Sequence, residues 1–327
     1  MELNIGEIAN KWKNDEPKYK KLGECVYNFL KDKITDIEIL PEISHRTKDL
    51  ISIIKKIKKK QREKEYGYHD LNDKLGIRII CNFTEDTEKV DTFLYDIFDI
   101  KKFEKKRDEL IFNRLDYISN HYDASIKSES YIFKSVKDLS DLIFEVQVRT
   151  LNQHAWANCA HSLSYKQEID LSAKLQRRVY RLLSIYEIAD DEFSAVNKIL
   201  LDNPDNLTYT ILRKLEGKIY KYAQADYDRD TSIYNLKILL NYFSKEQQND
   251  FIKNIESFIT TNSDKIKNIF FTNKLRYFEF PFLTQPEIFL IWYILEQYPF
   301  ILEENWDNDF DHSELEQIKI FWGKTID

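Results

Sequence analysis

The segment Phe144–Thr150 reads FEVQVRT, and its period decides how the middle of the chain folds. Two valines alternate with Glu145, Gln147 and Arg149, as in a β-strand that has one apolar face and one polar face. An acid, an amide and a guanidinium in register suit a metal ion and a polyphosphate better than a protein core. A solvated strand face gives the same alternation, so the rest of the chain has to decide between the two interpretations.

The composition indicates a globular protein with room for two domains. Of its 327 residues 43% are hydrophobic, and Gly and Pro number only 6 each, so a large core can form. The polar N-terminus does not resemble a secretory signal. The most apolar stretch, Ile288–Leu295, is far shorter than the ~20 residues that span a membrane. We therefore expect a cytoplasmic protein without a membrane segment.

Charge and cysteine usage narrow the class of ligand. Three widely spaced cysteines without a CxxC pair indicate neither a disulfide framework nor a zinc site. The net charge of −7 disfavours general coating of nucleic acid. Seven of the ten residues in Lys55–Lys64 are basic, however. A locally basic site in an acidic protein suits a small polyanion such as a nucleotide.

Hydrophobic spacing predicts helices before and after a central group of strands. The first ~65 residues are expected to be helical, with Ser44–Glu65 as one uninterrupted helix. The predicted strands are Leu75–Phe83, Leu115–Ile126, Tyr131–Val136 and Leu142–Thr150, with a helix at Thr84–Asp99. This order favours an α/β or α+β sheet domain over a barrel, and we expect the α+β class, in which helices flank a sheet.

After the last predicted strand the pattern is almost entirely helical, with helices expected at Asn152–Lys166 and Ser172–Asn197. Asp, Asn and Pro cluster at Leu201–Asn206. This cluster predicts a boundary between a domain at residues 1–200 and a helical domain at residues 201–327.

The role of the C-terminal domain is less defined by its sequence. The aromatic-rich segment Tyr277–Leu302 favours core packing, with a partner or self-association surface as the alternative. The C-terminal domain carries no recognisable motif of its own. We therefore expect this domain to regulate the protein or to bind a partner, either as a homo-oligomer or with a neutralising protein.

Four polar side chains share one face of the predicted helix at Ser44–Glu65. They follow one another at spacings of four, four and three residues: Lys48, Ser52, Lys56 and Lys59. A lysine row with a hydroxyl among it offers cations and a donor to a chain of phosphates, although a solvated lysine face gives the same pattern. Arg46, in the first turn, could lie flat over an aromatic base.

Asp73 stands at the start of the predicted strand Leu75–Phe83, with Gly76 and Arg78 close behind it. Gly76 removes a side chain, so another group can approach the backbone there. Asp73 together with Glu145 would suit Mg²⁺, which prefers one or two protein carboxylates and fills its other positions with water and phosphate oxygens. An ordinary residue at the start of a strand is the alternative for Asp73.

Tyr117, Ser119 and His121 alternate along the string YISNH, so the three should share one strand face. An aromatic ring, a hydroxyl and an imidazole in a row could stack on a base and contact phosphates or ribose. A lone histidine on a strand is more often structural, and this alternative stays open.

Five strings, taken in order from Arg46 to Phe193, resemble the RelA/SpoT-type alarmone synthetases. They are RTKDLISIIKK, DKLGIRII, YISNH, EVQVRT and HAWANCAHSLSYK, and a helix that contains IADDEF ends the resemblance at Phe193. The resemblance implies a nucleotidyltransferase-like mixed sheet flanked by helices. It also implies Mg²⁺-dependent transfer of the β,γ-pyrophosphate of ATP to a 3′-hydroxyl, usually that of GDP or GTP. Such a transfer requires alignment and charge neutralisation rather than a nucleophilic side chain.

The resemblance implies a role for each matching residue. Arg46 and Arg78 would enclose the adenine of ATP. The phosphates of ATP would contact the row made of Lys48, Ser52, Lys56 and Lys59. Asp73 and Glu145 would bind Mg²⁺, and Glu145 would also help to deprotonate the attacking hydroxyl. On the acceptor side Tyr117 would stack on the base, His121 would contact the transferring phosphates, and Ser119, Gln147 and Arg149 would support the acceptor, the metal and the nucleotide.

Departures from the family pattern fall on the acceptor side. The family often has Asn-Gly before the stacking tyrosine and Lys or Arg after it, and the neighbours of Tyr117 differ at all three positions. The usual upstream lysine is also missing, with Asn113 and Arg114 nearby instead. The acceptor is therefore open: GDP or GTP leads, and the 3′-end of tRNA or an adenine nucleotide, as in a toxic family member, is the alternative.

Two further expectations concern what the chain does with its product. A non-catalytic nucleotide sensor is the alternative from another class, and the presence of both predicted metal carboxylates opposes it. Only 45 residues precede Arg46, so we expect no hydrolase module. The enzyme should then make its product without being able to destroy it.

Overall fold

The computed structural model describes residues 4–105, 119–128, 136–164, 172–203 and 206–324. The strand expected at Tyr131–Val136 lies outside these residues except for Val136, and so does the start of the strand expected at Leu115–Ile126. The chain forms two compact units. The first unit comprises Met1–Ile37 and Pro41–Asn197, and the second comprises Glu38–Leu40 and Lys198–Asp327.

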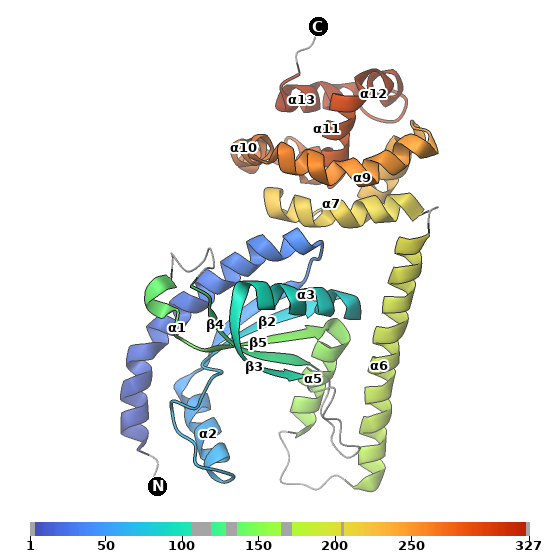
Figure 1. Ribbon diagram of the computed structural model, residues 1–327. Helices are drawn as coiled ribbons and strands as arrows, with labels where there is room; N and C mark the ends of the chain where they lie inside the picture. Colours follow the sequence, from blue (N-terminus) through green and yellow to red (C-terminus); the bar gives the residue numbers. More distant parts are fainter. Residues whose placement is uncertain (1–3, 106–118, 129–135, 165–171, 204–205, 325–327) are drawn as a thin grey trace. The chain divides into compact units, whose positions relative to one another are not determined.

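A mixed sheet, five-stranded among the described residues, forms the centre of the first unit (Figure 1). In spatial order its strands are β1 (Glu42–Thr47), β2 (Leu75–Cys81), β5 (Phe144–Thr150), β4 (Asn120–Ile126) and β3 (Phe98–Lys105). The central strands β2 and β5 run parallel, and the other neighbouring pairs run antiparallel. The expected α+β class with a mixed sheet is confirmed.

The helices that precede, interrupt and follow the strands are α1 (Ile5–Lys33), α2 (Leu50–Gln61), α3 (Thr84–Ile97), α5 (Leu151–Ser164) and α6 (Ala173–Asp202), the last of which continues into the second unit. α1 packs against β1 and β2, while α3 packs against β2, β3 and β5. Ile77, Tyr122 and Val146 lie in one row across three strands and are fully buried. The next row on either side points to the opposite, polar face, because strand side chains alternate.

The prediction of one helix over Ser44–Glu65 is wrong at its start. Residues Glu42–Thr47 form β1, which pairs with β2, and the helix begins only at Leu50. Asp49 caps this helix, because its side chain accepts hydrogen bonds from the backbone N–H and the hydroxyl of Ser52. The partner strand β2 lies far from β1 in sequence, so the local spacing of residues could not reveal that β1 is a strand.

β3, at Phe98–Lys105, was not predicted as a strand either. Among the described strands it lies at the edge of the sheet and pairs with β4, and it carries the charged residues Asp99, Lys101, Lys102 and Glu104. Charged side chains are common on edge strands, where they discourage pairing with other chains. They also erase the apolar alternation by which a strand is recognised.

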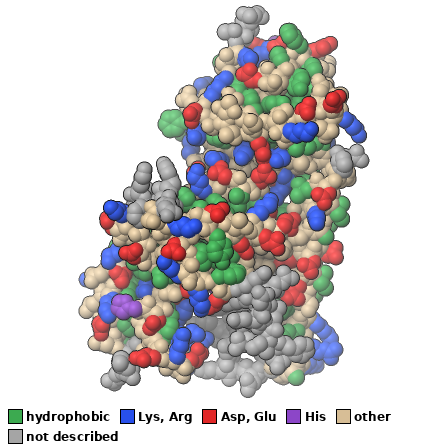
Figure 2. Space-filling view, viewed as in Figure 1, with side chains coloured by type: hydrophobic (Ala, Val, Ile, Leu, Met, Phe, Trp, Pro, Cys, Tyr) green, Lys and Arg blue, Asp and Glu red, His purple; other side chains and the backbone are tan. Residues whose placement is uncertain are grey.

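The second unit is helical and has its own core (Figure 1). Its helices are α7 (Leu207–Ala223), α8 (Arg229–Asn241), α9 (Lys245–Thr261), α10 (Ser263–Asn273), α11 (Ile288–Gln297), α12 (Pro299–Trp306) and α13 (His312–Trp322). All eight residues of Ile288–Leu295 are buried, so this apolar stretch is a core helix. None of the described helices is long and apolar enough to cross a membrane. Acidic and basic side chains are interspersed over the face shown in Figure 2.

Candidate functional site

The polar face of the sheet collects side chains from its three central strands. β2, β4 and β5 share one burial pattern, in which the polar-face residues in the first half of each strand are half-buried. The register places Arg78, Gln147 and His121 in one row across these strands. Glu145 stands between Gly76 and Asp123 in the adjacent row. Because Gly76 has no side chain, space is left beside Glu145.

Asp73 lies in the turn before β2, and two lysines share one oxygen of its carboxylate. Lys48 and Lys56 both donate to Asp73 Oδ2, the latter at 2.5 Å. Lys48 comes from the segment between β1 and α2, and Lys56 comes from α2. The other oxygen, Oδ1, is buried and has no hydrogen-bond partner within the described part of the chain. A buried carboxylate oxygen without a partner is costly unless a ligand completes it.

Glu145 is surrounded by groups that favour its ionised form. His121 Nδ1 lies 3.2 Å from Glu145 Oε1, and Gln147 Nε2 donates to Oε2 at 2.5 Å. Ser119 Oγ is 2.7 Å from the other nitrogen of His121, which orients the imidazole. Burial raises the pKa of Glu145, but the bonds from His121 and Gln147 and the charge of Lys56 outweigh it and lower the pKa to about 2.

The guanidinium groups of Arg78 and Arg149 lie in the same region as Glu145. Arg149 is buried and donates to Gln147 Oε1, so β5 carries a chain of hydrogen bonds from Arg149 through Gln147 to Glu145. Burial lowers the pKa of Arg149 to about 10, and the nearby charge of Arg78 acts in the same direction. Two cations held this close together favour a polyanionic ligand.

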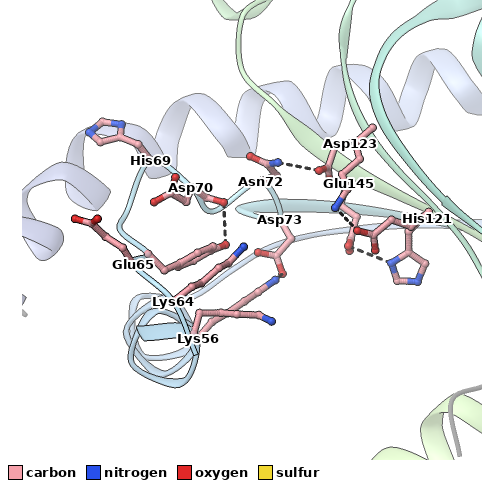
Figure 3. A pocket seen from close by; sticks show the side chains of 14 residues that line it. Lys56, Lys64, Glu65, His69, Asp70, Asn72, Asp73, His121, Asp123 and Glu145 are labelled. Carbon is pink, nitrogen blue, oxygen red and sulfur yellow. Dashed lines mark hydrogen bonds and ion pairs between the residues drawn. The ribbon is translucent and has the colours of Figure 1, made fainter. Parts of the chain in front are cut away.

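Two hollows meet at Asp73 and Glu145, which line both of them. The larger hollow has a volume of about 620 Å³, and Figure 3 shows its lining side chains. The smaller hollow has a volume of about 290 Å³. Its lining includes Arg46, Lys48, Ser52, Arg78 and Gln147. The two carboxylates therefore stand where two ligands, one in each hollow, would meet.

Most of the predicted site residues line the two hollows, with four exceptions: Lys59, Tyr117, Arg149 and Ser119, the last of which contacts His121 instead. Lys59 is exposed and lines neither hollow. Lys60 and Lys64 line the larger hollow instead. Lys60 follows Lys56 by four residues and so shares its face of α2, whereas Lys64 lies beyond the end of the helix. Tyr117 lies outside the described residues. Arg149 supports Gln147 and lines neither hollow.

Sequence reasoning also missed Asn72 and Asp123, both of which line the larger hollow. Asn72 Nδ2 donates to Asp123 Oδ2 at 2.8 Å, as Figure 3 shows. The signal for Asp123 was present, because it stands two residues after His121 and strand side chains alternate. The signal for Asn72 was only its position next to Asp73.

The arrangement fits Mg²⁺ better than a metal that needs several protein ligands. Among the described residues no group of three or more His, Cys, Asp or Glu side chains could hold a metal ion. Mg²⁺ commonly takes one or two carboxylates, with phosphate and water oxygens completing the octahedron. The unpartnered Oδ1 of Asp73 and the ionised Glu145 are suitable oxygen donors.

Comparison with known proteins agrees with the resemblance drawn from the sequence. Residues 45–170 match the family described as "Region found in RelA / SpoT proteins". The chain is 26% identical over 189 residues to the GTP pyrophosphokinase YjbM of Bacillus subtilis, covering 56% of this chain and 82% of the relative. It is 24% identical over 208 residues to the GTP pyrophosphokinase YwaC of the same organism, covering 60% of this chain and 94% of the relative.

Solved structures that the chain matches include the small alarmone synthetase 1 from Bacillus subtilis. The TM-score is 0.49 at 22% identity, and the match covers 59% of this chain and 100% of that one. A GTP pyrophosphokinase family protein from Streptococcus pneumoniae gives a TM-score of 0.46 at 21% identity, covering 60% of this chain and 94% of that one. Residues 45–170 of this chain thus match the RelA/SpoT region, and the chain is similar in sequence to the two Bacillus subtilis GTP pyrophosphokinases.

Proposed function

We propose that the chain transfers the β,γ-pyrophosphate of ATP to the 3′-hydroxyl of GDP or GTP, with Mg²⁺ as cofactor, and so makes (p)ppGpp-type alarmones. The observation that carries the proposal is the pair Asp73 and Glu145, which lines both hollows at the point where they meet. A donor in one hollow and an acceptor in the other would bring their reacting groups to these carboxylates. The relatives named GTP pyrophosphokinases support the same reaction.

The smaller hollow is the proposed donor site. Arg46 and Arg78 are available to enclose adenine, since guanidinium groups stack on aromatic rings. Lys48 and Ser52 lie in the same hollow, and Lys56 extends the row into the larger one. When ATP binds, its phosphates compete with Asp73 for the two lysines, which frees the carboxylate for the metal.

In the proposed reaction the acceptor 3′-oxygen attacks the β-phosphorus of ATP. The bond between that phosphorus and the oxygen bridging to the α-phosphorus breaks, and AMP leaves. Mg²⁺ bound by Asp73 and Glu145 would neutralise charge on the transferring phosphates. Lys56 and His121 line the same hollow and add positive charge or hydrogen bonds there.

The low pKa of Glu145 bears on its role. At a pKa of about 2 the carboxylate stays ionised at neutral pH, which suits metal binding. A carboxylate with so low a pKa is a weak base. The Glu145–His121 pair, rather than Glu145 alone, is therefore the proposed acceptor for the proton of the 3′-hydroxyl.

Transfer to the 3′-end of tRNA or to an adenine nucleotide is a second candidate within the same chemistry. Lys60 and Lys64 extend the basic surface of α2 along the larger hollow, and such a surface suits an RNA backbone. A non-catalytic nucleotide sensor is the third candidate. It gives no reason for two carboxylates at the junction of the hollows.

The test incubates the protein with Mg²⁺, γ-labelled ATP and one acceptor at a time: GDP, GTP, AMP, ATP or deacylated tRNA. We expect label on GDP or GTP and release of AMP. Label on tRNA alone would overturn the leading proposal in favour of the second, and nucleotide binding without any transfer would favour the sensor. Glu145→Gln should abolish transfer while leaving the fold intact by circular dichroism.

We further propose that the second unit regulates the transferase or binds a partner, as a homo-oligomer or with a neutralising protein. It has its own buried core, and no predicted site residue lies in it. Deletion of residues 205–327 tests this proposal. Unchanged activity, oligomeric state and toxicity in cells would contradict it.

A further inference from the structure

The turn that carries Asp73 is anchored firmly on one side. Lys74 is buried, donates to the carbonyl oxygen of Leu71 at 2.7 Å and lies 4.6 Å from the ring centroid of Tyr68. Tyr68 in turn donates to Asp15 of α1 at 2.9 Å. The C-terminal side of Asp73 is thereby fixed to the body of the first unit.

The N-terminal side of Asp73 is attached to the sheet by one side-chain hydrogen bond. Asn72 Nδ2 donates to Asp123 Oδ2 at 2.8 Å, across 51 residues of sequence. Asp123 lies on β4, and its register partner on β5 is Glu145. A bond from Asn72 to Asp123 therefore connects the residue before one predicted metal carboxylate with the residue beside the other, as Figure 3 shows.

Asp73 itself is held by groups from outside the sheet's centre. Lys48, from the segment before α2, and Lys56, from α2, both donate to its Oδ2. Asn72 connects the same turn to the sheet, where Glu145 stands. One Mg²⁺ needs oxygen ligands about 2.0–2.1 Å away in nearly ideal octahedral geometry. Both carboxylates can therefore bind the same ion only if they stand at a suitable separation.

We propose that Asn72 and Asp123 are positioning residues that set the spacing between Asp73 and Glu145 so that one Mg²⁺ can bind both. This inference rests on the proposed function, since it assumes the metal site. It assigns a role to two residues that no sequence string singled out. Groups that orient metal ligands typically affect metal affinity by about 10–100-fold.

The test measures metal binding as well as turnover. Mn²⁺ serves as the probe, and its binding is followed by electron paramagnetic resonance in the presence of an ATP analogue with a methylene between the α- and β-phosphorus. Asn72→Ala and Asp123→Ala should each weaken Mn²⁺ binding about tenfold. Binding of the analogue without metal should stay unchanged. In turnover assays the Mg²⁺ concentration for half-maximal rate should rise, with kcat at saturating Mg²⁺ little altered.

A swapped pair tests whether the hydrogen bond itself is responsible. In the double variant Asn72→Asp with Asp123→Asn, the amide at position 123 can donate to the carboxylate at position 72, and the net charge is unchanged. We expect this pair to restore most of the Mn²⁺ affinity. Failure to restore it in a folded protein would overturn the role assigned to the bond.

A matched control separates positioning from general stability. Asp91 of α3 accepts from Asn120 of β4 at 2.6 Å, the same amide–carboxylate chemistry away from both hollows. Asp91→Ala should lower the melting temperature and leave Mn²⁺ affinity unchanged. If Asp91→Ala loses as much Mn²⁺ affinity as the other two variants, their loss comes from lower folding stability, and the positioning role is overturned.

Asp73→Asn distinguishes failure of this inference from failure of the proposed function. If Asp73→Asn binds Mn²⁺ like the wild type, the metal site itself is wrong. If Asp73→Asn loses Mn²⁺ while Asn72→Ala and Asp123→Ala bind it normally, the metal site stands and the positioning role is overturned.

Discussion

Asp73 and Glu145 are both carboxylates at the junction of the two hollows, yet their surroundings differ. Lysines contact Asp73, whereas an imidazole and an amide contact Glu145. The lysine contacts neutralise Asp73 when no ligand is bound, and they can be exchanged for phosphate contacts without leaving a charge unpaired. Lys56 is central to this exchange, because it binds Asp73 and also lowers the pKa of Glu145.

Lys56 and Lys59 provide a matched pair of substitutions at this scale. Lys56→Ala should lower kcat/KM for ATP about a hundredfold or more, since it removes a cation from the site of developing charge. Lys59 is exposed outside both hollows, so Lys59→Ala should change the rate by less than about twofold. Steady-state kinetics with saturating acceptor measures both. Equal losses in the two variants would contradict the assignment of the hollows.

At the scale of elements, α1 approaches the sheet closely at one glycine. A Cβ on Gly23 would lie 2.8 Å from His45 Nδ1 and 2.9 Å from Leu75 Cδ1, closer than van der Waals contact allows. His45 belongs to β1 and Leu75 to β2, the strands that carry Arg46 and Arg78. The position of α1 therefore affects the strands of the proposed donor site.

We expect Gly23→Ala to destabilise the first unit by about 1–3 kcal/mol, because overpacking outweighs the gain in helix propensity. Gly6→Ala is the control in the same helix, since its Cβ would come no closer than 3.6 Å to another atom. It should be neutral or stabilising by up to about 1 kcal/mol. Urea unfolding followed by circular dichroism distinguishes the two variants. A stable Gly23→Ala would mean that α1 can move away from the sheet.

The start of α11 contains a buried acid in the second unit. Glu287 is 4% exposed, and burial raises its pKa, although the bond from Asn235 opposes the shift. The folded protein thus retains a proton on this carboxyl at pH values where the unfolded chain has lost it. Its contribution to stability is largest below the ordinary pKa of 4.5 and declines as the pH rises towards the raised value.

Glu287→Gln removes this dependence, because an amide does not titrate. The melting temperature of the variant relative to the wild type should therefore increase as the pH is raised from about 4 to 7. Differential scanning calorimetry at several pH values measures the difference. A difference that is constant across this range would show that Glu287 titrates normally despite its burial.

At the scale of the whole molecule, each unit has its own core, and the predicted site residues belong to one unit alone. All the predicted site residues lie in the first unit, and the aromatic-rich segment Tyr277–Leu302 contributes most of its side chains to the core of the second. Substitutions such as Glu287→Gln should accordingly leave the Mn²⁺ affinity of the first unit unchanged. This expectation connects the calorimetric and metal-binding measurements in one set of proteins.

The sequence by itself determined the strand at Phe144–Thr150 and the resemblance to RelA/SpoT proteins, which implies the mixed sheet, because these depend on side-chain alternation and on short strings whose order is preserved. It also named Asp73, Glu145 and His121, since their residue types and strand period are local properties. The use of Lys60 and Lys64 instead of Lys59 was not predictable in the same way. It depends on how α2 packs in the folded unit, where Ile53 and Ile57 are buried and Lys56 contacts Asp73.

Only the tertiary structure decided how these residues are placed relative to one another. Asn72 and Asp123 are 51 residues apart, and no local pattern relates an amide in a turn to a carboxylate on a distant strand. The sheet order brings them together, because β5 lies between β2 and β4. The alternation of side chains is a property of neighbouring residues. Contacts across the sheet, by contrast, form only when the whole unit folds, so they depend on its total free energy of folding.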